Sequence, residues 1–547
     1  MEAVTVDGQL RQGRWLIHFS LISKWKNATA CYPSNLALFV LILFLAWLLT
    51  GLVCWPFPGG HAWGKYWWTR GLFRHFSSIP GPRGIPFLGS MSLMMGLSHR
   101  HLAKEAERHN AKRLMAFSVG ESRTVVTCNP EVAKDILNNP AFVDRPAKES
   151  AYKLRFYRSI GFAPYGDYWR TLRKIAAVHL FSPKQISKLD GPRFRIAAEM
   201  VAEIKNKSGE AVNIRNLLKL AALKNTICLI FGQMYLSSLS DEKSRQVQKQ
   251  LLSLLEDGSD LLGKLDLSDH LPLLSRLDLQ RNRSRCNKLL PRVNRLVQSM
   301  VRDYCQLDTD HAAGKSFVDV LFSIRSSENL SDADINAIVW EVIFRGTGTV
   351  AILSEWAMAR MVLHQEIQKK AQEELDKFVG RSRAVTESDM IELVYIQSIV
   401  KETLRLHPPG PLLSWARLSR HDTVVDGHYI PAGTTGIVNM WAITHDPQVW
   451  ERPLEFDPDR FQSKNDDAKK ISVFGSDLEL APFGSGRRSC PGKLVGVCTV
   501  EFWVATLLHE FQWFPASTRG GVDLSENLRL SCEMVEPLMV KVQTRCT

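Results

Sequence analysis

The sequence predicts a mainly α-helical protein with a small β region, preceded by one N-terminal transmembrane helix. Three observations predict this architecture. An uncharged apolar run lies near the N-terminus, segments with helical signals dominate the rest of the chain, and β-rich runs gather in two places of its C-terminal part. The chain has 547 residues, of which 45% are hydrophobic and 23% charged, a composition typical of folded globular proteins.

The apolar run occupies residues 36–55 and reads LALFVLILFLAWLLTGLVCW. A helix of this length spans about 30 Å, the thickness of a bilayer core. It is apolar on all sides, which favours a membrane anchor over a buried core helix, and a cleaved signal peptide would have a shorter apolar core. Two lysines precede the run, and Lys65, Arg70 and Arg74 follow it closely. This excess favours a cytoplasmic body, and Asn27, in an N-A-T triplet, would then be a candidate glycosylation acceptor in the lumen.

A proline-rich connector follows the anchor. Residues 79–86 read IPGPRGIP, and three prolines at this spacing predict a stiff, extended segment instead of a helix. The chain therefore divides into an N-terminal segment, a transmembrane anchor, a linker with a Pro-rich hinge and one large domain: 1–35, 36–55, 56–86 and 87–547.

The body carries more helical than strand signals. Helices are expected over Glu131–Asn138, Ser187–Lys205, Gln248–Leu262 and a long segment that begins at the capping residue Ser331 and ends near Leu363. β-Rich runs are expected in two regions, Asp422–Met440, with a hairpin pattern, and Leu528–Val542.

Charge and cysteine content narrow the function classes. The formal net charge is +13, but there is no long Lys/Arg block and no nucleic-acid motif, so a nucleic-acid partner is not expected. A basic face toward anionic lipids or an acidic electron donor fits the charge, as does a solvated surface without a partner. The ten cysteines form no C-x-x-C pair, which gives no support to zinc sites or redox dithiols and favours a reducing compartment.

The strongest functional signal is the segment 481–492, which reads APFGSGRRSCPG. A thiolate that binds iron needs an exposed sulfur kept anionic and sheltered from water. Glycines let the backbone loop around that sulfur so that N–H groups can point at it, and such hydrogen bonds tune the iron. A basic residue two positions before the cysteine can meet a haem carboxylate. A buried structural cysteine in a Gly-rich turn is the alternative.

Five fixed positions of this loop, Phe483, Gly486, Arg488, Cys490 and Gly492, resemble the haem-binding loop of the cytochrome P-450 superfamily. The resemblance implies the cytochrome P-450 fold over roughly Ile79 to the C-terminus. It also implies that heme b is bound through the Cys490 thiolate and that the other four residues shape the cofactor site. Electron donation by such a thiolate favours O–O cleavage.

Two further motifs resemble the family's structural triad. Residues 402–405 read ETLR and match Glu-x-x-Arg, in which the charged residues share one helix face. Residues 456–461 read FDPDRF and resemble the Pro-Glu-Arg-Phe segment, with aspartate in place of glutamate. The resemblance implies that Glu402, Arg405 and Arg460 form a triad that holds the cysteine loop and does no chemistry.

The same resemblance assigns partners to the haem carboxylates. Residues 169–173 read WRTLR, and the i, i+4 spacing of Trp169 and Arg173 places an indole N–H and a guanidinium on one helix face. In the family both residues bind a haem propionate. Arg417 stands where many members place another propionate partner.

The oxygen-binding motif departs from the family pattern. Residues 344–349 read FRGTGT in the middle of the long predicted helix. Gly346 would loosen the helix to make room for dioxygen, and Thr349 would be the catalytic residue that hydrogen-bonds dioxygen during proton delivery. Arg345 replaces a small residue, and Gly348 stands where an acid normally relays protons.

Three segments narrow the resemblance to the plant A-type group, in particular the KLUH-like subfamily associated with organ and seed growth. These are FVDRP at 142–146, GFAPYG at 161–166 and FRGT at 344–347. In that subfamily Arg345 is expected, so only Gly348 remains unusual.

The resemblance implies a monooxygenase that inserts one atom of dioxygen into a hydrophobic, fatty-acid-like small molecule. The chain lacks a flavin or nicotinamide fingerprint, so electrons would come from a separate NADPH-dependent cytochrome P-450 reductase. Its expected place is the endoplasmic reticulum membrane, as a single-pass protein in contact with membrane lipids, with a cytoplasmic catalytic domain.

Two other functions fit the haem motifs. A haem-thiolate hydroperoxide isomerase or dehydratase is compatible with Gly348, although Thr349 and the uninterrupted cysteine loop argue against it. A non-catalytic haem-binding membrane protein is the third reading.

Overall fold

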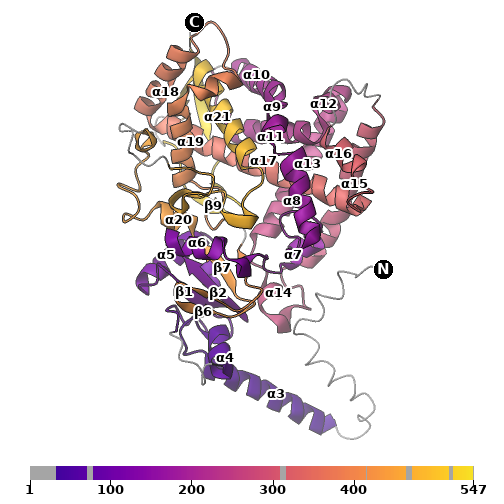
Figure 1. Ribbon diagram of the computed structural model, residues 1–547, viewed down its shortest axis with the longest axis vertical. Helices are drawn as coiled ribbons and strands as arrows, with labels where there is room; N and C mark the ends of the chain where they lie inside the picture. The colour runs from indigo at the N-terminus through magenta and orange to yellow at the C-terminus, as the bar shows by residue number, and fades with distance from the viewer. Residues whose placement is uncertain are drawn as a thin grey trace.

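The structure, a computed structural model, describes residues 33–70, 78–207, 209–307, 316–413, 416–462, 471–516 and 521–545. Helices make up most of the body, and the strands β1, β2 and β7 lie at the end from which α3 projects (Figure 1). The candidate acceptor Asn27 and the basic residue Arg74 lie outside the described residues.

The helices confirm a mainly α-helical body. In chain order they are α3 Pro33–Cys54, α4 His61–Arg70, α5 Ser98–Arg108, α6 Pro130–Leu137, α7 Glu149–Lys153, α8 Asp167–His179, α9 Pro183–Ser187, α10 Asp190–Asn206, α11 Ile214–Phe231, α12 Gln233–Ser238, α13 Asp241–Gly263, α14 Leu267–His270, α15 Asn282–Cys305, α16 Phe317–Ser323, α17 Asp332–Leu363, α18 Gln365–Phe378, α19 Val394–Leu406, α20 Met440–Thr444 and α21 Lys493–Glu510.

The strands form small sheets. The largest has the order β1-β2-β7-β4, in which β2 and β7 are parallel and the other pairs antiparallel. Its strands are β1 Met115–Val119, β2 Ser122–Thr127, β4 Arg417–Leu418 and β7 Thr435–Val438. A second sheet joins β3 Val212–Asn213, β11 Met539–Thr544 and β8 Phe511–Pro515, and two hairpins pair β5 Thr423–Val425 with β6 His428–Ile430 and β9 Glu526–Leu528 with β10 Cys532–Met534. The strands expected in both C-terminal regions are confirmed.

The long predicted helix is confirmed as α17. The Ser331 hydroxyl accepts a hydrogen bond from the Asp334 N–H at 3.2 Å, and the Asp334 carboxylate accepts one from the Ser331 N–H at 2.9 Å. This reciprocal pair satisfies two donors at the helix start. The expected helix over 187–205 is instead the end of α9 and most of α10, because Pro192 lacks an N–H and therefore favours a new helix start close before it.

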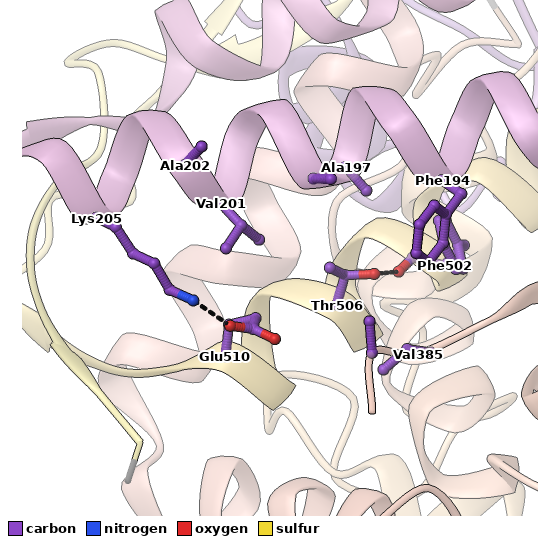
Figure 2. A pocket seen from close by; sticks show the side chains of 11 residues that line it. Phe194, Ala197, Val201, Ala202, Lys205, Val385, Phe502, Thr506 and Glu510 are labelled. Atoms are coloured by element: carbon purple, nitrogen blue, oxygen red, sulfur yellow. Dashed lines mark hydrogen bonds and ion pairs between the residues drawn. The ribbon is translucent and has the colours of Figure 1, made fainter. Parts of the chain in front are cut away.

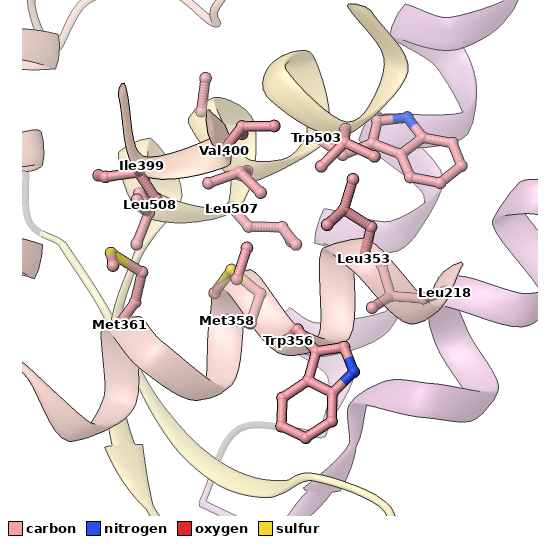
Figure 3. Packing of buried hydrophobic residues seen from close by; sticks show 14 of the residues in the cluster. Leu218, Leu353, Trp356, Met358, Met361, Ile399, Val400, Trp503, Leu507 and Leu508 are labelled. Carbon is pink, nitrogen blue, oxygen red and sulfur yellow. The ribbon is translucent and has the colours of Figure 1, made fainter. Parts of the chain in front are cut away.

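The core around α17 fixes the position of the later site. Trp356 and Met358 on α17 pack with Val400 on α19 and with Trp503 and Leu507 on α21 (Figure 3). All five side chains are almost fully buried. Because α21 begins directly after the cysteine loop, this packing holds the loop in a fixed place relative to α17.

The N-terminal helix α3 is a candidate membrane span. The window Ala37–Cys54 has a mean hydropathy of 2.7, and most of its residues are exposed. The helix α17 is also long and apolar enough to cross a membrane, but it is mostly buried inside the body. We therefore assign α17 to the core, and α3 is the candidate anchor.

The C-terminal end of α3 is docked on the body. The Trp47 ring stacks on the Phe87 ring with centroids 4.3 Å apart. A Cβ on Gly51 would lie 2.0 Å from the Phe87 ring, so only glycine admits this approach. The segment after α3, expected to be a linker, contains α4, whose Trp63 indole N–H donates to the carbonyls of Phe117 and Thr124 at 3.2 Å.

We expect Trp63→Ala to destabilise the haem-loaded full chain by about 3–5 kcal/mol, because it removes a fully buried indole and leaves a cavity. Trp68→Ala is the matched control, since Trp68 is an exposed tryptophan on the same helix, and it should change stability by less than about 0.5 kcal/mol. The measurement is chemical denaturation in detergent. Equal midpoints for the two variants would contradict the docking of α4.

Candidate cofactor site around Cys490

A closed backbone loop presents the Cys490 side chain. The Cys490 N–H donates to the Phe483 carbonyl at 2.9 Å, which brings the two ends of the loop together. Gly486 has φ +68°, and a Cβ there would lie 2.4 Å from the Leu137 carbonyl oxygen, so the residue must be glycine. The loop ends at Gly492, which caps the start of α21. Sequence and geometry therefore agree on a shaped loop around one sulfur.

Cys490 combines an exposed side chain with a dense protein environment. Its side chain is exposed, yet the surrounding protein is dense enough that burial raises the pKa of the thiol. The Gly492 N–H and the charges of Arg345 and Arg173 act in the opposite direction and favour the thiolate. Thr349 is also exposed, although the neighbouring residues of α17 are mostly buried. A thiol of this kind would be deprotonated by a metal ion that it binds.

Arginines from separate elements surround this site. They come from α8, α17, β4, the loop after η4 Pro140–Phe142 and the cysteine loop: Arg173, Arg345, Arg417, Arg145 and Arg488. Burial lowers the pKa of each guanidinium, and repulsion by its neighbours lowers it further in Arg145, Arg417 and Arg488. The pKa of Arg417 falls to about 9 and that of Arg488 to about 10.

Two carboxylates offset only part of this charge. Glu341 lies 3.5 Å from the Arg345 guanidinium, and Asp144 lies 3.6 Å from that of Arg488. The site therefore keeps an excess of positive charge, although desolvation there disfavours charged side chains. An anionic group with more than one carboxylate would stabilise this arrangement.

Backbone carbonyls position several of these donors. Arg488 donates to the Val143 and Ala163 carbonyls at 2.8 and 2.7 Å, and its guanidinium lies 4.4 Å from the centre of the Trp169 ring. Arg173 donates to the Ser489 carbonyl at 2.9 Å. The structure thus brings the predicted residues Trp169, Arg173 and Arg488 together beside the cysteine loop.

Arg417 carries unsatisfied donors. Its Nη2 donates to the Ser485 carbonyl at 3.3 Å, but within the described residues its buried Nε and Nη1 have no hydrogen-bond partner. Buried polar atoms without partners are rare in native proteins and call for an explanation. An open sulfur, a surplus of guanidinium groups and unsatisfied Arg417 donors fit haem, whose iron takes a thiolate and whose propionates take cations.

The predicted triad lies together. Glu402 and Arg405 are both fully buried and form two parallel hydrogen bonds, 2.7 and 2.8 Å long. Arg460 Nε lies 3.1 Å from the Glu402 carboxylate. Arg405 also donates to the Thr444 and Pro453 carbonyls, so the triad ties α19 to the segment around 444–460. Because α19 packs against α21, this segment is linked to the helix that follows the cysteine loop.

The helix α17 passes Gly346 without interruption, contrary to the expected loosening. A Cβ at Gly346 would lie 3.1 Å from Thr226, so the glycine lets α11 approach closely. At Gly348 no atom lies within 4 Å of an added Cβ. The Thr349 hydroxyl donates to the Arg345 carbonyl at 3.2 Å.

Two other features do not resemble this site. A pocket of about 280 Å³ between α10 and α21 has a largely apolar lining, with the Lys205–Glu510 ion pair at its side (Figure 2). His99, Glu526 and Cys532 could place three ligand atoms within 4.8 Å of one another, but Cys532 is buried and burial raises the pKa of its thiol. Neither feature has the open sulfur and the arginines found around Cys490.

A family model described as Cytochrome P450 matches residues 79–537. The chain belongs to the cytochrome P450 family.

Several of its relatives are plant cytochromes P450 of the 78A group, as the resemblance to the KLUH-like subfamily predicted. Cytochrome P450 78A9 of Arabidopsis thaliana is 56% identical over 529 residues, which cover 96% of this chain and 97% of the relative. Cytochrome P450 78A3 of Glycine max is 52% identical, over 94% of this chain and 96% of the relative. Cytochrome P450 78A1 of Zea mays is 41% identical, over 96% of each chain. This cytochrome P450 is therefore a haem-thiolate monooxygenase of the 78A type.

The structure adds two residues, Arg145 and Glu341, to the site. The sequence motifs had given neither of them a role in it. Arg145 was part of a segment that pointed to the plant group, and Glu341 lies just before the oxygen motif. A charge of either sign inside an apolar stretch is the signal that could have drawn attention to Glu341. Arg145 gives no such signal, because only the fold brings it to the other arginines.

Proposed function

We propose that this cytochrome P450 inserts one atom of dioxygen into a hydrophobic, fatty-acid-like substrate. Haem would be held by the Cys490 thiolate, and electrons would come from an NADPH-dependent cytochrome P-450 reductase. The observation that carries the proposal is the exposed Cys490 side chain, presented by a closed loop beside a cluster of arginines from five segments. Haem, when bound, supplies the reductive activation of dioxygen.

The residues of the site have separate roles in this proposal. Cys490 binds iron, and the Gly492 N–H stabilises its negative charge. Phe483 and Gly486 shape the loop. The haem carboxylates are bound by Arg173, Arg417, Arg488 and, as an addition from the structure, Arg145. Trp169 is proposed as a further partner, although its indole N–H donates to the Ile160 carbonyl at 3.0 Å in this structure.

Two groups act without binding the cofactor. The triad of Glu402, Arg405 and Arg460 keeps α19, α21 and the cysteine loop in register. Thr349 is the catalytic residue, whose hydroxyl holds a proton close to dioxygen.

The anchor sets the cellular place in this proposal. The exposed apolar helix α3 crosses the endoplasmic reticulum membrane once, in contact with lipids, and the catalytic domain is cytoplasmic. The proposed division is an N-terminal segment 1–35, the anchor 36–55, the linker 56–86 and the catalytic domain 87–547. The linker is docked on the catalytic domain through α4. The proposal of a role in plant organ or seed growth rests on the resemblance to the KLUH-like subfamily alone.

A hydroperoxide isomerase or dehydratase is the second candidate function. Gly348 favours it, because that chemistry needs no proton relay from this position, and a non-catalytic haem protein would not need one either. NADPH consumption separates the three readings: only the monooxygenase oxidises NADPH through the reductase and forms a hydroxylated product.

The test begins with the reduced carbon monoxide difference spectrum of the purified protein, which reports thiolate ligation. NADPH oxidation with purified reductase is then measured across a panel of fatty acids and other lipids. A thiolate-type spectrum together with substrate-dependent NADPH oxidation and an oxygenated product supports the proposal. Turnover of hydroperoxides without reductase, or no turnover with any lipid, contradicts it.

We expect Arg417→Gln to speed haem loss while leaving the haem-free chain at least as stable. The substitution removes a buried guanidinium that neighbouring arginines repel, and this relief offsets the lost hydrogen bond to the Ser485 carbonyl in the haem-free chain. The contact with haem is lost only in the holoprotein. Losing a charged hydrogen bond of about 1.5–3 kcal/mol corresponds to a roughly 10- to 100-fold weaker haem affinity. Haem transfer to an excess acceptor protein measures the rate.

Arg420→Gln is the matched control for this prediction. Arg420 is a partly exposed arginine three residues along the chain that pairs with Asp144 at 3.3 Å. Its loss should not change haem transfer by more than about twofold, since an exposed pair contributes about 0–1 kcal/mol. Equal haem-loss rates for the two variants would remove Arg417 from the site.

A further inference from the structure

Four polar side chains of the mostly buried helix α17 form a stripe along one face. Asp334, Glu341, Arg345 and Thr349 stand at i, i+7, i+11 and i+15. At 3.6 residues per turn these positions share one face of the helix. Burying two charged residues in a helix of this kind is costly, which indicates a use beyond stability.

The outer end of the stripe contacts solvent through two partners. The Asp334 carboxylate accepts hydrogen bonds from Arg158 Nη1 and from the Tyr168 hydroxyl, both at 2.8 Å. The Arg158 and Tyr168 side chains are each about one-third exposed. Protons from water can therefore reach this end of α17.

The inner end of the stripe reaches Thr349. The buried Glu341 carboxylate accepts the Gly161 N–H at 2.7 Å and lies 3.5 Å from Arg345 Nε. The Arg345 carbonyl accepts the Thr349 hydroxyl at 3.2 Å. Arg345 is itself close enough to Cys490 for its charge to lower the pKa of that thiol.

The reaction requires protons at this buried place. Insertion of one oxygen atom follows O₂ + RH + 2 e⁻ + 2 H⁺ → ROH + H₂O, so two protons must arrive for each turnover. The electrons come from NADPH through the reductase, but the protons must cross the protein. Gly348, next to Thr349, has no side chain that could carry them.

We propose that protons reach Thr349 along this stripe, with Glu341 as the buried acid that gives up a proton toward Thr349 and regains one from the Asp334 end. The inference rests on the proposed function. Glu341 gives up its carboxyl proton toward Thr349, becomes a carboxylate, and is reprotonated from solvent. No bond other than O–H bonds is formed or broken along the stripe.

The surroundings of Glu341 allow both protonation states. The groups that face it are Arg345 on its own helix, Arg173 and Tyr168 on α8, Arg145, Arg488, the Ser159 hydroxyl and the N–H groups of Ile160 and Gly161. Burial raises the pKa of the carboxyl, whereas Arg345 and the hydrogen bonds lower it. Because these two effects on the pKa oppose each other, the Glu341 carboxyl can exist both as the neutral acid and as the carboxylate.

The test compares Glu341→Gln with Glu355→Gln in the haem-loaded full chain with reductase. Glu355 is a buried carboxylate on the same helix that pairs with Arg215 at 2.9 Å, so the control removes a similar buried ion pair. Glu341→Gln is expected to raise hydrogen peroxide released per NADPH about tenfold, below the 10²–10⁴-fold range of general acid–base catalysis because water carries some protons. Glu355→Gln should leave this ratio unchanged.

The double variant Glu341→Gln, Gly348→Asp separates proton supply from structure. An added side chain at Gly348 meets no atom within 4 Å, so the new acid fits and should restore low peroxide release. If Glu341 only holds Gly161 or Arg345, the new acid rescues nothing. Equal peroxide release by wild type and Glu341→Gln, or failed rescue, overturns the proposal.

A readout without turnover completes the test. Infrared difference spectra between acidic and alkaline pH should show a carboxyl band that is lost in Glu341→Gln and kept in Glu355→Gln. Loss of the same band in both variants, or in neither, counts against Glu341 as a titrating acid. If the wild type oxidises no NADPH, the proposed function is contradicted. If NADPH oxidation is normal and Glu341→Gln has no effect, only this inference is contradicted.

Discussion

Cys490→Ser is expected to abolish the thiolate-type spectrum of the reduced carbon monoxide complex, and monooxygenation with it. A serine hydroxyl is a weak iron ligand and cannot donate electrons as a thiolate does. The loop itself should persist, because its closing hydrogen bond joins the Cys490 N–H to the Phe483 carbonyl and does not use the side chain. Cys490→His should likewise bind haem with a spectrum that lacks the thiolate character.

Cys532→Ser is the control for this result. It changes the same atom in a buried cysteine outside the arginine cluster, and the thiolate-type spectrum should survive. If Cys490→Ser kept the spectrum, or if Cys532→Ser removed it from folded protein, the assignment of the iron ligand would be wrong.

Arg405→Ala should yield little haem-loaded protein. The substitution removes the two hydrogen bonds that Arg405 donates to the fully buried Glu402 carboxylate, and it frees the carbonyls of Thr444 and Pro453. Breaking one side of a buried pair costs about 3–5 kcal/mol, which is a large part of the stability of a domain. Soluble yield and haem content per chain are the measurements.

The exposed arginine Arg452 offers a matched control in the same region. It pairs with Glu455 at 2.9 Å, and its side chain is 57% exposed. Arg452→Ala should therefore change stability by about 0–1 kcal/mol and leave haem content normal. Normal haem content in Arg405→Ala would refute the structural role of the triad.

Much of the fold follows from local signals in the sequence. Ser331 predicted the start of α17 because its hydroxyl and Asp334 satisfy each other's backbone donors. The strands β1 and β2 were not predicted. Both are short, most of their residues are buried, and their polar and apolar side chains do not alternate. The helix α4 escaped because its sequence has few helical signals and its Trp63 is fixed by distant carbonyls.

The site divides in the same way. The cysteine loop is one continuous segment, and Glu402 and Arg405 stand three residues apart on one helix. Local spacing therefore made a contact possible, and the family resemblance supplied the prediction. The arginine cluster is assembled from five elements, and neither Arg145 nor the orphaned donors of Arg417 have a local signature. Glu341 and Arg345 lie one helical turn apart, which the sequence shows. The Gly161 N–H that donates to Glu341 is distant in sequence, and only the folded chain brings it there.

The docked end of α3 limits how the body can rotate. An anchor joined by a flexible chain would let the body turn freely above the bilayer, whereas the stacking of Trp47 on Phe87 and the burial of Trp63 remove most of that freedom. With α3 in the bilayer, as proposed, a membrane-bound electron donor of the proposed kind would search for this protein in two dimensions and over few orientations. The rotational entropy would then be lost before the two proteins collide. The effective concentration of correctly oriented electron donors would rise without any added contact between the two proteins.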